Sequence, residues 1–381
     1  SDLSKMLRTI SPWFEHKLFL TATPHNGHTR SFTGLLEQLD PVRFTQTSEF
    51  TDASRKRAEE VVVRRLKREI NALDKEQGRP ERFSERIPEP MPLFFSKSER
   101  LLARAYQEFR KGVRKVIAQS DRSEQLAGLF AVEVLNKRLL SSPFTFADSW
   151  YRFKEGMKEE EKASTVELNA ARKAVDEDLD DDQEAEGRIQ HAARTTGAWL
   201  KPLAPDLEEE MDALDKALAL IGLTPPIEGR AAPLPEEDAR WERFLQLVQD
   251  RLRDGKQWLP DERLIVFTEY KTTLDYLHRR LKKAFPEEGV IRVLYGGMDD
   301  QEREGIKKAF NDPHDPVKIL VATDAASEGL NLQETARFVL HYDIPFNPSR
   351  LDQRNGRLDR HGQARDVIVF HFTSEDDSDL R

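Results

Sequence analysis

The stretch that decides the fold is residues 319–363, which read ILVATDAASEGLNLQETARFVLHYDIPFNPSRLDQRNGRLDRHGQ. It contains two apolar runs, Ile319–Thr323 and Phe338–Tyr342, whose length and β-branched content are typical of buried strands. In parallel α/β sheets, the loops that leave the carboxyl ends of strands carry the ligand chemistry. The second loop brings three arginines within the seven residues 354–360. A guanidinium group stays charged and can bind two phosphate oxygens at once, so this spacing indicates a phosphoryl or polyanionic ligand. The alternative is a solvated, arginine-rich helix face.

Two longer patterns in this stretch decide against the solvated face. Asp324 begins D-x-x-x-E-G-x-N-L-Q, and Gln353 begins Q-R-x-G-R-x-x-R-x-G-Q. In this order they resemble motifs V and VI of superfamily-two helicases and, within these, of the Swi/Snf-type DNA translocases. Three further blocks are similar to parts of the same family: LTATPHNG at 20–27 to motif III, LIVFTEY at 264–270 to motif IV, and LNKRLLSSP at 135–143 to an element of the bacterial RapA-like branch.

The resemblance implies a nucleotide site on this stretch. Arg357 and Arg360 match the family's arginine fingers, which reach the γ-phosphate of ATP and can be worth about 10³–10⁵ in rate. ATP is expected together with Mg²⁺, whose ligands would lie in a first motor lobe. Arg354 is either a third phosphate contact or a structural partner of a carboxylate such as Asp324. The other residues implied are Gln353, Glu328, Gly329 and Asn331 near the nucleotide, and Thr21 and Thr23 for coupling the ATP site to the lobe interface.

The resemblance also implies a track for the DNA backbone on the same lobe. Small hydroxyl groups and glycine amides suit contacts to phosphates that hold without reading the base sequence. Binding to double-stranded DNA should therefore weaken with added salt and show little sequence preference. The residues that match such backbone contacts are Thr268, Gly296, Gly297, Thr323 and Ser327.

The order of apolar and amphipathic segments indicates the fold class. Expected strands at 264–268, 291–295, 319–323, 338–342 and 367–372 alternate with expected helices at 237–253, 271–284, 300–311 and 349–361. Such alternation predicts an α/β fold, with a mostly parallel sheet covered by helices on both faces. The resemblance makes this sheet the second RecA-like motor lobe, accompanied by the end of lobe 1 and a large, mostly α-helical insertion.

Five segments are expected along the chain. Residues 1–40 end lobe 1, with a short buried strand at 17–24, and residues 41–100 bridge the lobes, with a charged helix at 52–77 and a strand at 91–95. Residues 101–221 form the helical protrusion, with helices at 98–119, 122–141, 188–200 and 206–221. Residues 222–236 are rich in proline and glycine and predict a linker, and residues 237–381 form lobe 2.

Composition limits the class of protein. The chain has 381 residues and no cysteine, which excludes disulfides and thiolate metal sites and suits a reducing compartment, so we expect a cytoplasmic protein. No apolar run approaches the roughly 18 residues that a membrane span needs. The net charge of −9 lies in residues 155–187, which hold 13 Asp and Glu against 4 Lys and Arg, so basic faces for DNA remain possible elsewhere. This acidic tract is either a solvated, partly disordered arm or a brake that occupies the DNA cleft and mimics phosphate.

Two motifs that an ATP-driven motor needs do not occur in the sequence. These are the phosphate loop G-x-x-x-x-G-K-[ST] and the D-E-x-H type of carboxylate pair that holds magnesium. The run Asp261-Glu262-Arg263 precedes an expected strand, whereas the magnesium carboxylates end one. We therefore expect either a fragment that begins inside lobe 1, inactive by itself, or a half-motor whose partner supplies the rest.

Three functions stay open at this point. The first is an ATP-dependent double-stranded DNA translocase, the second a non-catalytic DNA-binding or scaffold module, and the third a strand-separating helicase. For the translocase, the similar families suggest two partners. One is RNA polymerase, as for RapA-like recycling proteins, and the other is the set of subunits of the DISARM anti-phage system. Because this sequence shows no polymerase-binding domain, the defence role is favoured.

Overall fold

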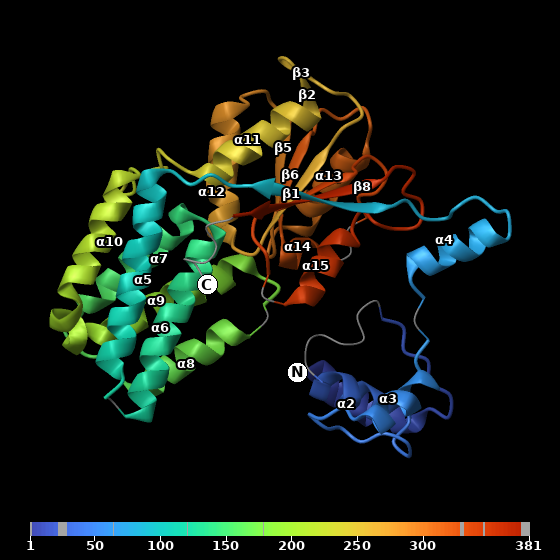
Figure 1. Cartoon of the computed structure of the whole chain (residues 1–381), viewed down its shortest axis with the longest axis horizontal. Coiled ribbons are helices and arrows are strands. Elements are labelled where there is room, and N and C mark those ends of the chain that lie inside the picture. The colour runs from blue at the N-terminus through green and yellow to red at the C-terminus, as the bar shows by residue number, and fades with distance from the viewer. Residues whose placement is uncertain are drawn as a thin grey trace. The chain divides into compact units, whose positions relative to one another are not determined.

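The computed structural model describes residues 2–21, 29–63, 65–119, 121–177, 179–327, 331–345 and 347–374. The chain divides into two compact units, and most of their elements are labelled in Figure 1. Unit 1 comprises Ser1–Ser84 and Pro345–Gly356, and unit 2 comprises Glu85–Ile344 and Arg357–Arg381.

Unit 2 is built on a six-stranded sheet in which every pair of neighbours is parallel. The strand order is β1-β8-β7-β4-β6-β5. The predicted α/β class is therefore confirmed, and five of the strands lie within one residue of their expected bounds. The strands are β1 Arg86–Pro92, β4 Leu264–Thr268, β5 Ile291–Leu294, β6 Ile319–Thr323, β7 Phe338–His341 and β8 Val367–Thr373.

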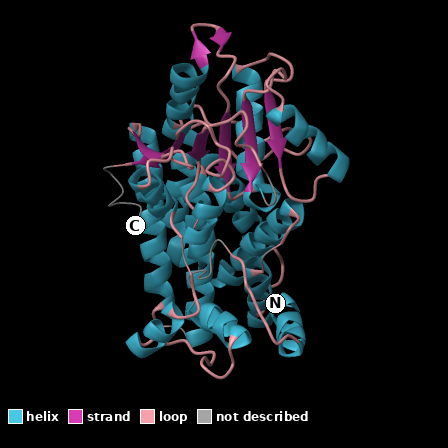
Figure 2. Cartoon of the chain, turned by 90° about the vertical axis from the view of Figure 1, so that its right-hand side faces the viewer, coloured by secondary structure: helices cyan, strands magenta, loops and turns pink. Residues whose placement is uncertain are grey.

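The sheet is buried on both faces, which explains why its central strands read as continuous apolar runs. Leu264 and Val266 of β4 belong to one core, and Ile265 and Phe267 belong to the other, because successive side chains of a strand point to opposite faces. Helices α11 (Ala239–Leu252) and α12 (Lys271–Ala284) contribute to the first core, and α13 (Asp300–Asn311) contributes to the second. Figure 2 shows the strands in magenta with helices on either side.

The helical insertion shares the first core with the sheet, so the two form one unit. Its helices stand together in Figure 1. Helix α6 has the predicted bounds, α7 was not predicted, and α9 begins six residues before the expected position 188. The expected linker 222–236 lies inside unit 2. The elements are α5 Lys97–Ile117, α6 Arg122–Ser141, α7 Pro143–Met157, α8 Thr165–Asp176, α9 Asp182–Leu200, η2 Lys201–Leu207 and α10 Glu208–Leu220, followed after α11 by the hairpin β2 Arg253–Asp254 and β3 Gln257–Trp258.

Helices α7 and α9 approach closely because each has a glycine against the backbone of the other helix. A Cβ atom on Gly156 would lie 1.9 Å from the carbonyl oxygen of Arg194, and one on Gly197 would lie 1.9 Å from that of Phe153. Around this crossing Trp150, Phe153 and Trp199 are buried. The acidic tract is thereby joined to the core of the insertion, since its described part includes the end of α7, all of α8 and the first turns of α9.

Unit 1 is helical in its described part, which differs from two expectations. The strand expected at 17–24 is not present in residues 17–21, where Leu18 and Leu20 are 81% and 87% exposed, and residues 22–24 lie outside the described residues. The helix expected at 52–77 is two helices, separated near three consecutive valines whose branched side chains disfavour helix. The elements are α1 Asp2–Ile10, η1 Ser11–Trp13, α2 Thr29–Leu39, α3 Asp52–Glu59, α4 Lys67–Glu76 and α15 Pro348–Asn355, the last ending six residues before the expected 361.

A membrane-spanning helix was not expected, and none of the helices in the described ranges is both long and apolar enough to cross a bilayer.

Candidate functional site

The carboxyl edge of the sheet gathers most of the residues predicted to bind DNA. Thr268 ends β4, Thr323 ends β6, and the two are register partners. Gly296 and Gly297 stand two and three residues after the end of β5, with Tyr295 between. Because parallel strands end at the same edge, these four residues stand at or just beyond the ends of three adjacent strands.

Gly296 and Thr323 converge on one carboxylate oxygen. The amide of Gly296 donates to Asp182 Oδ2, and the hydroxyl of Thr323 donates to the same oxygen at 2.5 Å. The amide of Asp182 donates back to the Gly296 carbonyl at 3.2 Å. Asp182 is the first residue of α9, and its side chain is only 8% exposed. An anionic oxygen therefore fits this pair of donors.

The environment of Asp182 raises the pKa of its carboxyl group. Burial is the largest cause, and the like charges of Asp324 and Asp181 act in the same direction. The hydrogen bonds from Thr323 and Gly296 oppose the shift because they favour the charged form. The carboxylate is thus held by donors in a place that remains costly for a negative charge.

Thr268 lies in a second polar cluster, where helices of the insertion meet the sheet. Its hydroxyl, which is fully buried, donates to Asp343 Oδ2 at 2.6 Å, and Ser141 Oγ of α6 donates to the same oxygen at 2.7 Å. The amide of Glu269 donates to Asp343 Oδ1 at 2.8 Å. Ser141 is also 2.6 Å from the hydroxyl of Thr273 in α12. A DNA contact by Thr268 would compete with these hydrogen bonds.

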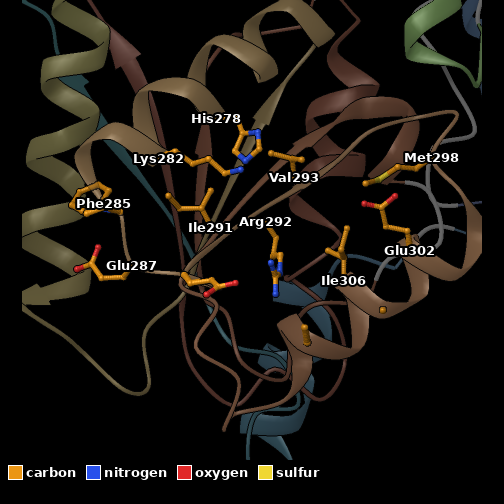
Figure 3. Close-up of a pocket in the computed structure, with 15 residues that line it drawn as sticks. His278, Lys282, Phe285, Glu287, Ile291, Arg292, Val293, Met298, Glu302 and Ile306 are labelled. Carbon is orange, nitrogen blue, oxygen red and sulfur yellow. The ribbon is translucent and has the colours of Figure 1, made fainter.

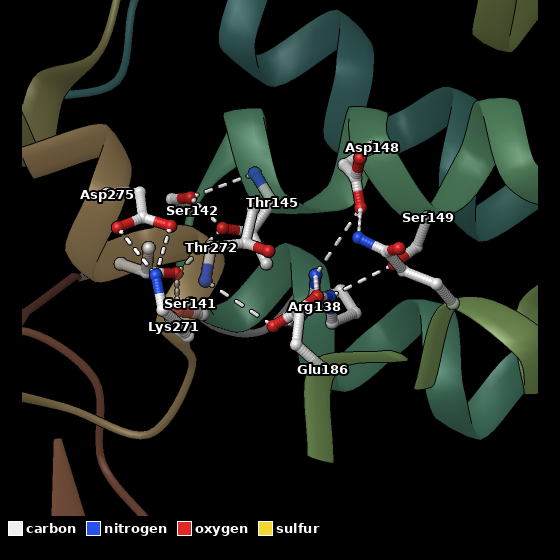
Figure 4. Close-up of polar contacts among 12 residues, drawn as sticks. Arg138, Ser141, Ser142, Thr145, Asp148, Ser149, Glu186, Lys271, Thr272 and Asp275 are labelled. Atoms are coloured by element: carbon white, nitrogen blue, oxygen red, sulfur yellow. Dashed lines mark hydrogen bonds and ion pairs between the residues drawn. The ribbon is translucent and has the colours of Figure 1, made fainter. Parts of the chain in front are cut away.

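A buried ion pair joins α9 to this junction (Figure 4). Arg138 of α6 is 1% exposed and donates through both terminal nitrogens to Glu186, 3.1 Å from Oε2. Arg138 Nε donates to Ser149 Oγ at 3.0 Å, and Arg138 also lies 3.7 Å from Asp148. Glu186 Oε2 accepts from the amide of Thr272 at 3.4 Å, at the start of α12. Since Glu186 stands one helical turn after Asp182, α9 is attached to the lobe at two successive turns.

The loop that carries the two predicted arginine fingers lies beside Asn331. Arg360 donates to the side-chain oxygen of Asn331, and the backbone of Asn331 accepts from Asn311 Nδ2 at 2.8 Å. The carbonyl of Arg357, whose side chain is 9% exposed, accepts from the amide of Leu332 at 3.2 Å. The structure therefore brings Arg357, Arg360 and Asn331 together, as expected for one site.

The remaining predicted residues stand on other elements or lie outside the described residues. Asp324 begins the short helix α14 (Asp324–Ser327) directly after β6 and is half-buried. Glu328, Gly329 and Thr23 lie outside the described residues, and nothing is described of the Ser327 side chain. Gln353 and the buried Arg354 stand on α15 in unit 1, and Thr21 belongs to the same unit. Because Asp324 belongs to unit 2, the proposed pairing of Arg354 with Asp324 stays a prediction.

An open cavity of about 910 Å³ lies elsewhere on unit 2, between β5, α12 and α13 (Figure 3). His278 and Lys282 of α12 and Arg292 of β5 line it, with Glu302 of α13 opposite. Burial lowers the pKa of His278, and the positive charges of Lys282 and Lys271 lower it further against the opposing effect of Asp275. Among the described residues, none of those predicted for ATP or DNA lines this cavity.

Sequence reasoning missed the carboxylates that occupy the strand ends. Asp343 stands two residues after the end of β7, and a carboxylate after a buried strand is a signal that could have been used. Asp182 had no such signal, because it is one of many acids in its tract. Within the described ranges, no group of three or more His, Asp or Glu could hold a metal ion.

Comparisons with known proteins find similarity to parts of this chain. A family model described as the helicase conserved C-terminal domain matches residues 244–362, which include all of the strand-end residues above and the arginine loop. This match confirms the RecA-like character of the sheet. A solved structure, the C-terminal part of the Fun30 ATPase domain, aligns over 77% of this chain and 86% of its own, with 13% identity and a TM-score of 0.44. That similarity is too low to carry an argument about fold.

Two curated relatives are more similar in sequence. The protein named uncharacterized ATP-dependent helicase YqhH of Bacillus subtilis is 36% identical over 116 residues, 30% of this chain and 19% of that protein. RNA polymerase-associated protein RapA of Vibrio parahaemolyticus is 31% identical over 187 residues, 46% of this chain and 18% of RapA. The chain spans less than a fifth of the length of either relative. Residues 244–362 therefore match the helicase conserved C-terminal domain, and over the aligned parts the chain is similar to RapA-like, Swi/Snf-type superfamily-two helicases.

Proposed function

We propose that this chain provides the second motor lobe of an ATP-dependent translocase on double-stranded DNA. The observation that carries the proposal is the pair of donors at the carboxyl edge of the sheet, where Gly296 N–H and Thr323 Oγ1 point to one anionic oxygen. A phosphate oxygen of the DNA backbone has the charge and the acceptor capacity that this pair requires. Such contacts hold the backbone without reading bases, which suits a motor that moves along any sequence.

The loop that carries Arg357 and Arg360 supports the part of the proposal that concerns ATP. Arg360 and Asn331, which the resemblance implies for the nucleotide, are hydrogen-bonded to each other, and Arg357 precedes Arg360 by three residues. In this lobe, Arg357 and Arg360 would hold the γ-phosphate, and their charges would stabilise the negative charge that develops on it during hydrolysis. Magnesium ligands would come from a first lobe, so we expect this chain alone not to hydrolyse ATP.

The ATPase test uses a protein in which this chain is joined to a complete first lobe. We expect duplex DNA to stimulate its ATP hydrolysis, and Arg357→Ala to lower the stimulated rate by about 10³-fold or more. Arg104→Ala, which removes an exposed arginine of α5, is the matched control and should keep the rate. If the joined protein binds duplex DNA but never turns over ATP, the motor proposal fails and a non-catalytic DNA-binding module replaces it.

The DNA test measures fluorescence anisotropy of labelled duplexes as salt is raised. We expect the logarithm of the affinity to fall linearly with the logarithm of salt concentration, and two unrelated sequences to bind within about twofold of each other. A strand-displacement assay on a forked duplex separates translocation from helicase activity. ATP-dependent release of one strand would favour the strand-separating alternative.

The proposal also concerns the protein partner with which this translocase would work. The matched Vibrio relatives are named RNA polymerase-associated, which makes RNA polymerase the first partner to test by co-purification with this chain. A role beside anti-phage defence subunits stays a prediction, as does the cytoplasmic location that a DNA motor implies.

A further inference from the structure

We infer that the acidic turn, residues Asp180–Asp182 at the start of α9, is a built-in competitor of DNA phosphate at Gly296, Gly297 and Thr323. The chain would then hold its own phosphate site closed until this turn is displaced. The inference rests on the proposed function, because it assigns the competing ligand as nucleic-acid phosphate.

The first support is that the acidic turn uses the donors that a phosphate would use. Asp182 Oδ2 accepts from both Gly296 N–H and Thr323 Oγ1, at 2.5 Å from the latter. A carboxylate oxygen and a phosphate oxygen are both anionic acceptors, so one donor pair cannot serve both at once.

The second support is the closeness of the approach. A Cβ atom on Gly296 would lie 2.0 Å from the carbonyl oxygen of Asp180, and one on Gly297 would lie 2.7 Å from a carboxylate oxygen of Asp181. Gly297 also has φ of +83°, which favours glycine. The glycine pair therefore accommodates the whole acidic turn rather than one side chain, and the turn covers the loop that we assign to the DNA backbone.

The third support is electrostatic. Asp181 and Asp324 stand near the buried Asp182 and raise the pKa of its carboxyl group together with burial. A polyanion cannot approach the loop while these negative charges remain there. The charges of the turn therefore help to keep the loop closed to phosphate.

The fourth support is that α9 is anchored just beyond the turn. Glu186 is held by Arg138, and Gly197 packs against the backbone of α7. The amide of Ala185 donates to the Asp181 carbonyl at 3.0 Å, which is the first hydrogen bond of the helix. Opening the site therefore requires only the first turn of α9 to unwind, while the rest of the helix stays in place.

The experiment measures duplex affinity by anisotropy for the whole chain and three variants. Asp182→Ala removes the competing carboxylate, and Asp182→Asn keeps its shape without its charge, in case the alanine variant folds poorly. Glu209→Ala removes one negative charge from an exposed position of α10 and controls for net charge alone. We expect about tenfold tighter binding for Asp182→Ala, a smaller gain for Asp182→Asn, and at most about twofold for Glu209→Ala, because freeing a closed site raises the apparent affinity by the inverse of its open fraction.

Hydrogen exchange gives an independent readout of the turn itself. Saturating duplex should speed amide exchange in the segment 179–190 of the wild-type chain, because a ligand that competes with the turn must release it. Unchanged or slower exchange there, or equal gains for Asp182→Ala and Glu209→Ala, overturns the inference while leaving the proposed DNA binding intact. If neither the wild type nor Asp182→Ala binds duplex, the proposed function fails and takes the inference with it.

Discussion

The crossing of α7 and α9 yields the sharpest prediction about stability. Gly197→Ala would place a methyl group 1.9 Å from the carbonyl oxygen of Phe153, about 1.1 Å nearer than the 3.0 Å limit that Cβ atoms respect. Backbone atoms of a neighbouring helix cannot rotate away, so the two helices must separate. Separation would loosen the packing of Trp150 and Phe153, which are fully buried, and of Trp199.

The magnitude follows from two opposing effects. Overpacking of a core costs about 1–3 kcal/mol, and this contact belongs at the upper end, whereas alanine regains about 1 kcal/mol of helix propensity over glycine. We therefore expect Gly197→Ala to lower the free energy of unfolding by about 2 kcal/mol. Gly187 provides the matched control, because it lies on the same helix and a methyl group added to it would have no atom within 4 Å. Gly187→Ala should raise the free energy of unfolding by about 0.5–1 kcal/mol.

The assay is urea unfolding followed by circular dichroism, with hydrogen exchange to assign the loss to unit 2. Gly156→Ala should cost a similar amount, and the double variant with Gly197→Ala should cost less than the sum, because one separation of the helices accommodates both methyl groups. If Gly197→Ala is as stable as Gly187→Ala, the two helices do not touch as described, and the reasoning is refuted.

Three further predictions concern charged groups in unit 2. Arg138→Met should lower the free energy of unfolding in urea by about 3–5 kcal/mol, because it leaves Glu186 buried without its cation. Combining it with Glu186→Leu should recover part of this loss. A cost below about 1 kcal/mol for Arg138→Met would contradict the buried ion pair. The pKa of His278 should lie below 6.5 in an NMR titration and should rise in Lys282→Gln. Because the folded protein has the lower pKa, the unfolded chain is protonated first as pH falls, and His278 should reduce the free energy of unfolding below pH 6.5. Arg263→Gln should lower the thermal midpoint, since Arg263 is 1% exposed and donates to carbonyls at the end of α13, whereas an unchanged midpoint would show that water replaces it.

The sheet and its helices could be predicted because their signals are local. The bounds of α12, α13 and β6 agree with the expected residues, since a buried parallel strand is a continuous apolar run and an amphipathic helix repeats its apolar positions every turn. The run Asp261-Glu262-Arg263 before β4 makes structural contacts. Glu262 pairs with Arg337 at 2.8 Å, and Arg263 binds backbone carbonyls.

Elements whose stability depends on distant partners were predicted poorly. Strand β1 begins five residues before the expected 91–95 and contains Pro88, Pro90 and Pro92. Prolines at every second position place their missing N–H groups on one side of the strand, so the other side can still pair with β8 at the edge of the sheet. Conversely, the run at 17–21 has strand composition but no strand beside it in the described part of unit 1, and Leu18 and Leu20 are exposed.

The candidate site shows the same limit in its chemistry. A glycine pair and a threonine at strand ends indicate that an anionic oxygen approaches closely, but they do not identify the anion. DNA phosphate and the chain's own carboxylate need the same donors, and Asp182 lies 114 residues from Gly296 and 141 from Thr323. Local patterns report only that the tract 155–187 is acidic, whereas the fold selects which of its 13 acids is buried against the donors. The duplex affinities of Asp182→Ala and Glu209→Ala test whether DNA phosphate and the Asp182 carboxylate use the same site. If they do, removing the Asp182 charge raises the affinity, whereas removing the Glu209 charge does not.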